Sequence, residues 1–145
     1  MAIEGVKNTL KIGISLGLNI IFGNIGDDKE TLRKGVEFLL KYDDQATCRT
    51  IRPVTPYPGS PLYDLAIKRG LLKDCEDFYE NKHLNSDLVA VNFTDMTEDE
   101  IHRSLCEANT RLLTNYYKKC LSNVVEEVEK LYLEENIEFR GFRPH

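Results

Sequence analysis

The sequence has no run of apolar residues long enough to span a membrane, and its first residues, MAIEGVKNTLK, lack the apolar centre and cleavage site of a signal peptide. It also lacks an excess of positive charge. Nineteen Lys and Arg stand against 24 Asp and Glu, which gives a formal net charge of -5. No basic field is therefore available to attract nucleic-acid phosphates. We expect a cytoplasmic protein that binds neither a membrane nor nucleic acid.

Clustered metal ligands are missing as well. The four cysteines lie far apart in the sequence, and the three histidines stand without a carboxylate or second histidine at ligand spacing: Cys48, Cys75, Cys106, Cys120, His83, His102 and His145. In a reducing compartment the cysteines are expected to be free thiols. The histidines are interpreted as surface or packing residues.

The 145 residues, 41% hydrophobic and 30% charged, fit one domain with a modest core. Apolar residues at helical spacing from Ile3 to Ile14 predict a helix that stops by Gly17. The short apolar run Leu18 to Phe22 is typical of a strand buried on both faces, with a helical segment as the rival interpretation.

A second helix-and-strand pair follows. Asp27 is a candidate N-cap that forms a capping box with Glu30, and the segment 27–42 has one apolar face. The β-branched run Thr47 to Val54 predicts a strand that Pro53 ends. Alternating helices and strands are typical of a parallel sheet with right-handed crossovers.

The segment 52–72, RPVTPYPGSPLYDLAIKRGLL, contains four prolines at the carboxyl end of this second strand. In open α/β sheets this edge binds ligands, and prolines fix the backbone there. Ser60 is predicted to cap a helix with Pro61 at its first position, and Gly70 to end it in a left-handed turn. Arg49 and Arg52 flank the end of the strand; we expect them to form salt bridges rather than to bind an anion.

The rest of the chain is predicted to be mainly helical. Residues 72–87 indicate a short irregular helix and a loop, and residues 88–95 a short strand. Thr97 and Glu100 form a second capping box before a long amphipathic helix. Near Ser122 this helix either continues or restarts, with Val124, Val125, Val128 and Leu131 facing inward.

Two motifs in order, GLNIIFGNIGDDKET and TPYPGSPLY, make the stretch from Val6 to about Leu72 resemble part of the radical S-adenosylmethionine (SAM) enzymes. The resemblance is to the later part of their catalytic barrel, in the cobalamin-binding class that includes anaerobic magnesium-protoporphyrin IX monomethyl ester cyclases. There, a glycine turn like GLPGET follows one strand and TPYPGTPLY ends the next.

The resemblance implies an α/β fold: the last strands and helices of a partial (β/α) barrel with parallel strands over residues 1–72, then a mainly helical extension over 73–145. It also implies that a reduced 4Fe-4S cluster in the parent enzyme cleaves SAM to a deoxyadenosyl radical, which takes a hydrogen atom from the substrate. Seven residues at the two strand exits would line the adenosine part of SAM: Ile21, Phe22, Gly23, Asn24, Val54, Thr55 and Pro56.

The sequence departs from this family in lacking the cysteine trio that holds the cluster and a cobalamin domain. Asn24, Ile25 and Asp28 also differ from the residues usual in the glycine turn. The chain is therefore interpreted as the C-terminal fragment of an oxidoreductase, cyclase or methyltransferase, inactive alone. Its partners would be the N-terminal remainder of the enzyme, a small-molecule substrate and, for the isolated chain, a second copy.

Two alternatives stay open. The strand exits can be ordinary turns, and without the resemblance this is the better interpretation. The region Thr97 to Glu135 can instead make the chain a non-catalytic helical interaction or oligomerisation module. A cysteine trio encoded upstream in the gene would favour the enzyme.

Overall fold

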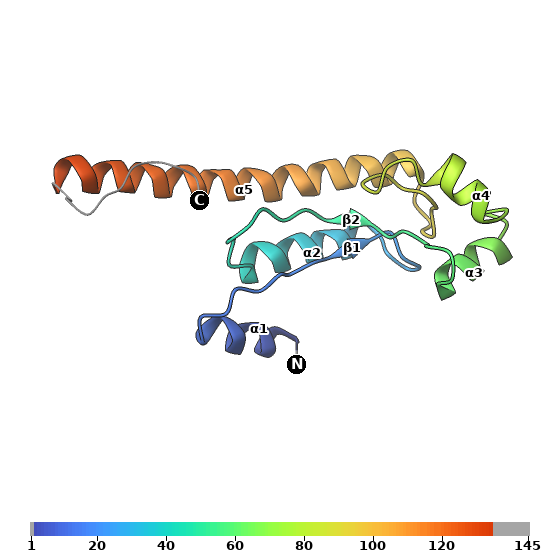
Figure 1. Cartoon of the computed structure of the whole chain (residues 1–145), viewed down its shortest axis with the longest axis horizontal. Coiled ribbons are helices and arrows are strands. Elements are labelled where there is room, and N and C mark those ends of the chain that lie inside the picture. Colours follow the sequence, from blue (N-terminus) through green and yellow to red (C-terminus); the bar gives the residue numbers. More distant parts are fainter. Residues whose placement is uncertain (1, 135–145) are drawn as a thin grey trace.

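The computed structural model describes residues 2–134. Its elements are α1 (Ala2–Lys11), β1 (Ile21–Phe22), α2 (Lys29–Tyr42), β2 (Arg52–Pro53), α3 (Pro61–Lys68), α4 (Cys75–Asp77), the π-helical turn η1 (Phe78–Lys82) and α5 (Glu98–Leu133). The long α5 runs across the molecule, with α2 and the two strands along its first half and α3 and α4 near its beginning (Figure 1). Within residues 2–134, no helix combines the length and apolar character needed to cross a membrane.

The predicted α/β fold with a partial (β/α) barrel is wrong. The described chain is mostly helical, and its sheet consists of two parallel strands of two residues each. The strand predicted at 88–95 is also absent: this segment is irregular, although Ala90, Val91 and Phe93 are buried. A parallel ladder is normally covered on both faces and flanked by further strands, and two strands alone sustain only a short one.

The direction of the two strands agrees with the prediction. β1 and β2 are parallel, with Ile21 opposite Arg52 and Phe22 opposite Pro53. The predicted burial of Leu18 to Phe22 on both faces is wrong, however, because side chains alternate across a strand. Phe22 is buried under α2 and α5, whereas Ile21 points to the other face and is 64% exposed.

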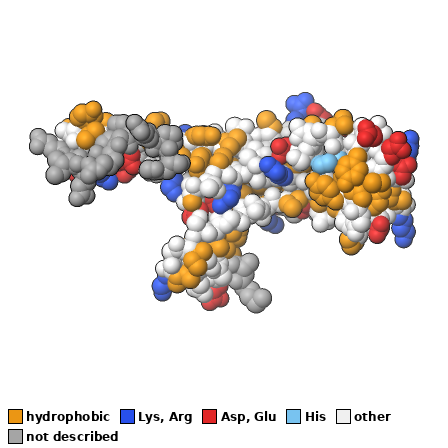
Figure 2. Space-filling view, in the orientation of Figure 1, with side chains coloured by type: hydrophobic (Ala, Val, Ile, Leu, Met, Phe, Trp, Pro, Cys, Tyr) orange, Lys and Arg blue, Asp and Glu red, His pale blue; other side chains and the backbone are white. Residues whose placement is uncertain are grey.

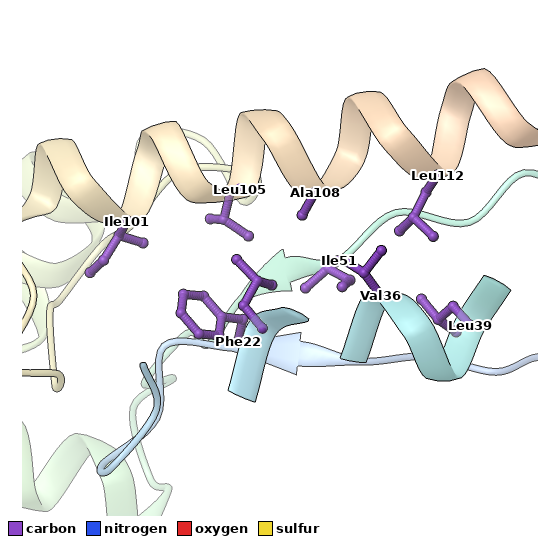
Figure 3. Close-up of a cluster of buried hydrophobic side chains, with 9 residues drawn as sticks. Phe22, Val36, Leu39, Ile51, Ile101, Leu105, Ala108 and Leu112 are labelled. Atoms are coloured by element: carbon purple, nitrogen blue, oxygen red, sulfur yellow. The ribbon is translucent and has the colours of Figure 1, made fainter. Parts of the chain in front are cut away.

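The main core lies between α5, α2 and the inner face of the strands (Figure 3). One stripe of α5 packs onto the buried side chains of α2, onto one side chain of β1 and onto the residue directly before β2: Ile101, Leu105, Ala108, Leu112, Leu32, Val36, Leu39, Phe22 and Ile51. A second cluster joins the segment 54–72 to Phe78 and the 90–93 segment. Both clusters combine residues from the 1–72 and 73–145 regions, and the proposed boundary between them stays a prediction.

Helix caps explain where the helices begin. Ser60 caps α3 by accepting a hydrogen bond from the Tyr63 amide, and Thr97 and Glu100 form the predicted capping box of α5. At α2 the predicted pair was wrong by one position. Asp28 is the N-cap and pairs with Thr31, which leaves the Asp27 carboxylate free for another contact.

The two ends of the described chain differ from expectation. α1 ends at Lys11, earlier than the stop expected at Gly17. Two residues later, Gly13 takes a left-handed backbone conformation. α5 is one continuous helix of 36 residues, but three of the four later apolar residues that were predicted to face inward do not, and the fourth, Leu131, is half-buried. Val124, Val125 and Val128 are exposed, because α5 runs on past the end of α2, where none of the other described elements lies beneath it (Figure 1).

Candidate functional site

The two strand exits lie side by side. The Val54 amide donates a 2.7 Å hydrogen bond to the Phe22 carbonyl, so the chain leaves both strands at the same edge of the sheet. A Cβ atom built on Gly23 would lie 3.8 Å from Cγ1 of Val54. Phe22, Gly23 and Val54, three of the seven residues predicted from the motifs, therefore meet at one point.

The turn after β1 is held by the Asp27 carboxylate. Its Oδ2 accepts hydrogen bonds from the amides of Gly23 at 3.0 Å and Asn24 at 2.9 Å, and the Asp27 amide donates to the Asn24 carbonyl at 3.0 Å. Gly23 has a φ of 99°, a backbone conformation that residues other than glycine rarely adopt. Since Asp27 already binds these two amides, a ligand at this exit would have to use other groups.

The exit after β2 is a rigid corner. The Tyr57 amide donates to the Thr55 carbonyl and the Ser60 amide to the Tyr57 carbonyl, both at 3.0 Å. Pro56 is among the most deeply buried side chains, while Val54 and Thr55 are partly exposed. The corner thus anchors itself through Pro56 and presents Val54 and Thr55 at the shared edge.

An aromatic cluster that was not predicted supports this corner. His83 stacks on Phe78 with ring centroids 5.1 Å apart and planes 8° apart, and Tyr57 meets both rings edge-on. The Tyr57 hydroxyl and His83 Nε2 lie 3.4 Å apart, and His83 Nδ1 is buried without a hydrogen-bond partner in the described part of the chain. Figure 2 shows hydrophobic side chains gathered beside a histidine over the region of α3 and α4.

The geometry of η1 places His83 in this cluster. η1 is a π-helical turn, a form that often occurs at functional sites, and it ends where the His83 amide donates to the Phe78 carbonyl at 2.7 Å. The Asn81 side chain donates to Asp77, which lowers the pKa of Asp77 and ties the start of the turn to its end. Burial raises the pKa of Tyr63, which lies against Phe78. The only sequence signal for this cluster was the aromatic content of EDFYENKH.

None of the described elements covers the outer face of the sheet. Its side chains line an open depression of about 390 Å³: Asn19, Ile20, Ile21, Cys48, Arg49, Thr50 and Arg52. Ile21 is the predicted rim residue that points here, away from the exits. As predicted, the two arginines form salt bridges, Arg49 with Asp43 at 3.2 Å and Arg52 with Asp87 at 3.0 Å.

The edges of the sheet are unequal. Directly before β2, the buried Ile51 amide donates to Asn109 Oδ1 at 2.8 Å, and Asn109 Nδ2 donates to the Ile51 carbonyl at 3.0 Å. A side chain of α5 thus takes the place of a neighbouring strand, and Pro53 has no amide to offer on that edge. On β1, no further strand lies beside the outer edge within the described residues.

Metal ligands do not come together in the described part of the chain. Within residues 2–134 no three His, Cys, Asp or Glu side chains form a group that could hold a metal ion. All four cysteines are free thiols, as predicted. His102 contacts the Val89 amide through Nε2 at 3.4 Å, and His145 lies outside the described residues.

Comparisons with models of known protein families, with curated proteins and with solved structures found no match to this chain.

Proposed function

We propose that this chain is the C-terminal portion of a radical SAM enzyme and supplies part of the rim that holds the adenosine of SAM. The observation that carries the proposal is the parallel pairing of the strands, with the hydrogen bond from Val54 to Phe22. It brings the GNIGDD turn and the TPYPG corner to one edge, where parallel strands bind ligands. Both motifs resemble those at the strand ends of this enzyme class.

The groups at the exits suit one part of SAM only. Because Asp27 occupies the amides of Gly23 and Asn24, and Asn24 Oδ1 accepts a hydrogen bond from the Ile25 amide, the adenosine would contact the apolar side chain of Val54. The Thr55 hydroxyl at the same exit is then the candidate partner for its polar edge. No described ligand group can hold a 4Fe-4S cluster. When bound in the parent enzyme, the cluster and SAM supply the radical; the present chain supplies contacts and is inactive alone.

The N-terminal remainder of the enzyme is the partner that the sheet favours. A parallel sheet normally has both faces covered, yet Ile21 and its neighbours leave the outer face open. Asn109 blocks the β2 edge, so added structure has access to the β1 edge and the outer face. We expect a cytoplasmic enzyme whose substrate is a small molecule; cobalamin would bind the remainder, as in the class it resembles.

The test begins with the DNA upstream of this coding sequence. It should encode three cysteines separated by three and then two residues, and their absence would refute the proposal. The joined protein, reconstituted anaerobically with iron and sulfide and then reduced, should release 5′-deoxyadenosine from SAM. Thr55→Glu should lower this rate at least roughly tenfold by placing a charge at the rim, whereas Thr110→Glu, on the exposed surface of α5, should not. The isolated chain should bind SAM weakly at most.

A helical interaction module is the second candidate, and one observation favours it. The second half of α5 exposes a series of apolar side chains instead of burying them. A joined protein that forms no 5′-deoxyadenosine, although it carries a loaded cluster, would make this candidate the better account.

A further inference from the structure

Tyr57 and His83 join the TPYPG corner to the turn η1. The Tyr57 hydroxyl and His83 Nε2 lie 3.4 Å apart, and both rings rest on Phe78, which is fully buried. His83 stacks on Phe78 with planes 8° apart, and Tyr57 meets Phe78 edge-on at a centroid distance of 5.8 Å. Packing on a buried ring therefore fixes where both side chains point.

The π-helical form of η1 makes this arrangement possible. Phe78 and His83 are five residues apart, and in an α-helix this separation places side chains about 140° apart around the axis. The hydrogen bond from the His83 amide to the Phe78 carbonyl, 2.7 Å long, widens the turn so that the two rings stack. Such turns are rare and often occur at functional sites. The widened turn thus places His83 beside Tyr57.

The surroundings of His83 favour one tautomer. Its Nδ1 is buried and has no hydrogen-bond partner within residues 2–134. A neutral imidazole carries a proton on one nitrogen only. On Nδ1 this proton would be a buried donor without an acceptor, which is rare in proteins, whereas from Nε2 it can be donated to the Tyr57 oxygen. We therefore expect the neutral ring to hold its proton on Nε2.

This tautomer leaves the hydroxyl proton of Tyr57 available. A hydroxyl whose oxygen accepts from His83 can donate its own proton to another acceptor. Tyr57 is 49% exposed, so its side chain is accessible from solvent. Its amide donates to the Thr55 carbonyl at 3.0 Å, which holds Tyr57 close to the shared edge of the two strands.

We propose that Tyr57 donates a hydrogen bond to the ligand at the strand exits, and that His83 is the positioning residue that leaves the hydroxyl proton free to do so. The identity of the ligand rests on the proposed function, under which it is SAM. The ribose oxygens and ring nitrogens of its adenosine are acceptors that a tyrosine hydroxyl can pair with. Tyr57 then adds a second donor to that of Thr55.

Nitrogen NMR of the isotope-labelled full chain tests the role of His83 without any ligand. At about pH 8, above the ordinary titration range of histidine, the ring proton of His83 should lie on Nε2. Tyr57→Phe removes the acceptor but keeps a ring, so the share of this tautomer should fall. The matched control is Tyr79→Phe, a tyrosine of similar exposure that also contacts Phe78, and it should change nothing. A wild-type ring with its proton on Nδ1 would overturn the proposal.

Binding of SAM to the joined enzyme tests the role of Tyr57. Tyr57→Phe should raise the dissociation constant for SAM about two- to tenfold, as expected for one lost hydrogen bond, and Tyr79→Phe should leave it unchanged. His83→Phe keeps a ring against Phe78 but cannot orient the hydroxyl, so its effect should be smaller. In the Tyr57→Phe background it should add nothing, whereas a merely structural role would give additive losses and overturn the positioning role.

The outcomes for this proposal and for the proposed function are distinguishable. A joined enzyme that releases no 5′-deoxyadenosine refutes the enzymatic function, while the His83 tautomer is measured on the chain itself. An active enzyme in which Tyr57→Phe binds SAM as tightly as wild type overturns the role of Tyr57 and leaves the enzymatic function standing. Circular dichroism should show all variants folded.

Discussion

Asn109 offers the sharpest test of how this fold is held together. Its side chain makes two hydrogen bonds to the backbone of Ile51, accepting from the amide at 2.8 Å and donating to the carbonyl at 3.0 Å. Ile51 is 1% exposed, so water does not readily replace these bonds. Asn109→Ala would leave both backbone groups without their partner.

The expected loss follows from the cost of unpaired buried groups. Each backbone group left without a partner costs about 1–3 kcal/mol, so Asn109→Ala should lower the free energy of unfolding by about 2–6 kcal/mol. The lower end applies if the space left by the side chain admits water. Thr110→Ala, at the exposed neighbouring position, should change the free energy of unfolding by less than about 0.5 kcal/mol.

Asn109→Asp tests the two hydrogen bonds to Ile51 separately. A carboxylate still accepts from the Ile51 amide but faces the Ile51 carbonyl without a proton to donate. The folded state should therefore raise the pKa of the introduced carboxyl. With a raised folded pKa, the folded state binds the proton more tightly, so the deficit against wild type should shrink as pH falls from 7 to 4.

Urea unfolding followed by circular dichroism gives the free energies, and hydrogen exchange reports on the Ile51 amide directly. Exchange at Ile51 should be faster in Asn109→Ala than in wild type. A loss below about 0.5 kcal/mol, or unchanged exchange at Ile51, would refute the idea that α5 substitutes for a strand.

Three further predictions concern local structure. Gly23→Ala should lower the free energy of unfolding in urea by about 1–3 kcal/mol, because Gly23 has a φ of 99°; crowding is not the reason, since an added Cβ would be 3.8 Å from its nearest neighbour. A loss no larger than that of Thr110→Ala would contradict this. The Arg33 guanidinium donates a hydrogen bond to Glu30 and lowers the pKa of Glu30 to about 2. This pair should therefore stabilise the fold above pH 4.5 and lose its effect as the pH falls towards 2. An NMR titration should show that the pKa of Glu30 is higher in Arg33→Gln than in the wild-type chain. Thr97→Ala should cost about 1 kcal/mol by removing the cap of α5, and thermal unfolding with no loss would argue against that role.

The sequence predicted local features best where a few neighbouring residues decide the outcome. The caps of α3 and α5 formed as expected, because the hydroxyl of an N-cap residue accepts a hydrogen bond from the backbone amide three positions on, within one turn. At α2 three acceptors stood close together, Asp27, Asp28 and Glu30, and spacing alone could not choose among them. The structure uses Asp28 as the cap and Asp27 to hold the Gly23 turn.

Features that depend on distant partners were predicted less well. The run Leu18 to Phe22 is apolar enough for burial on both faces, but its own residues do not decide whether another element covers the outer face, and Ile21 is exposed there. The same holds for Val124 and Val128, whose apolar character predicted a core contact where none exists. The contact between Asn109 and Ile51 joins residues 58 positions apart, and no local sequence pattern predicts it. At the candidate site, the motifs identified the strand exits but not His83 and Tyr57.

The outer face of the sheet allows a test of whether this chain is a fragment of a larger enzyme or a complete module. Ile21 is exposed in the isolated chain, so Ile21→Lys should change its free energy of unfolding by less than about 0.5 kcal/mol. If the N-terminal remainder covers this face, the same substitution buries a charge in the joined enzyme and should cost several kcal/mol there. Thermal unfolding of Ile21→Lys in both contexts measures the difference, with Thr110→Lys as the exposed control. Equal tolerance in the two contexts would mean that the outer face stays open, and the proposed partner would then be wrong.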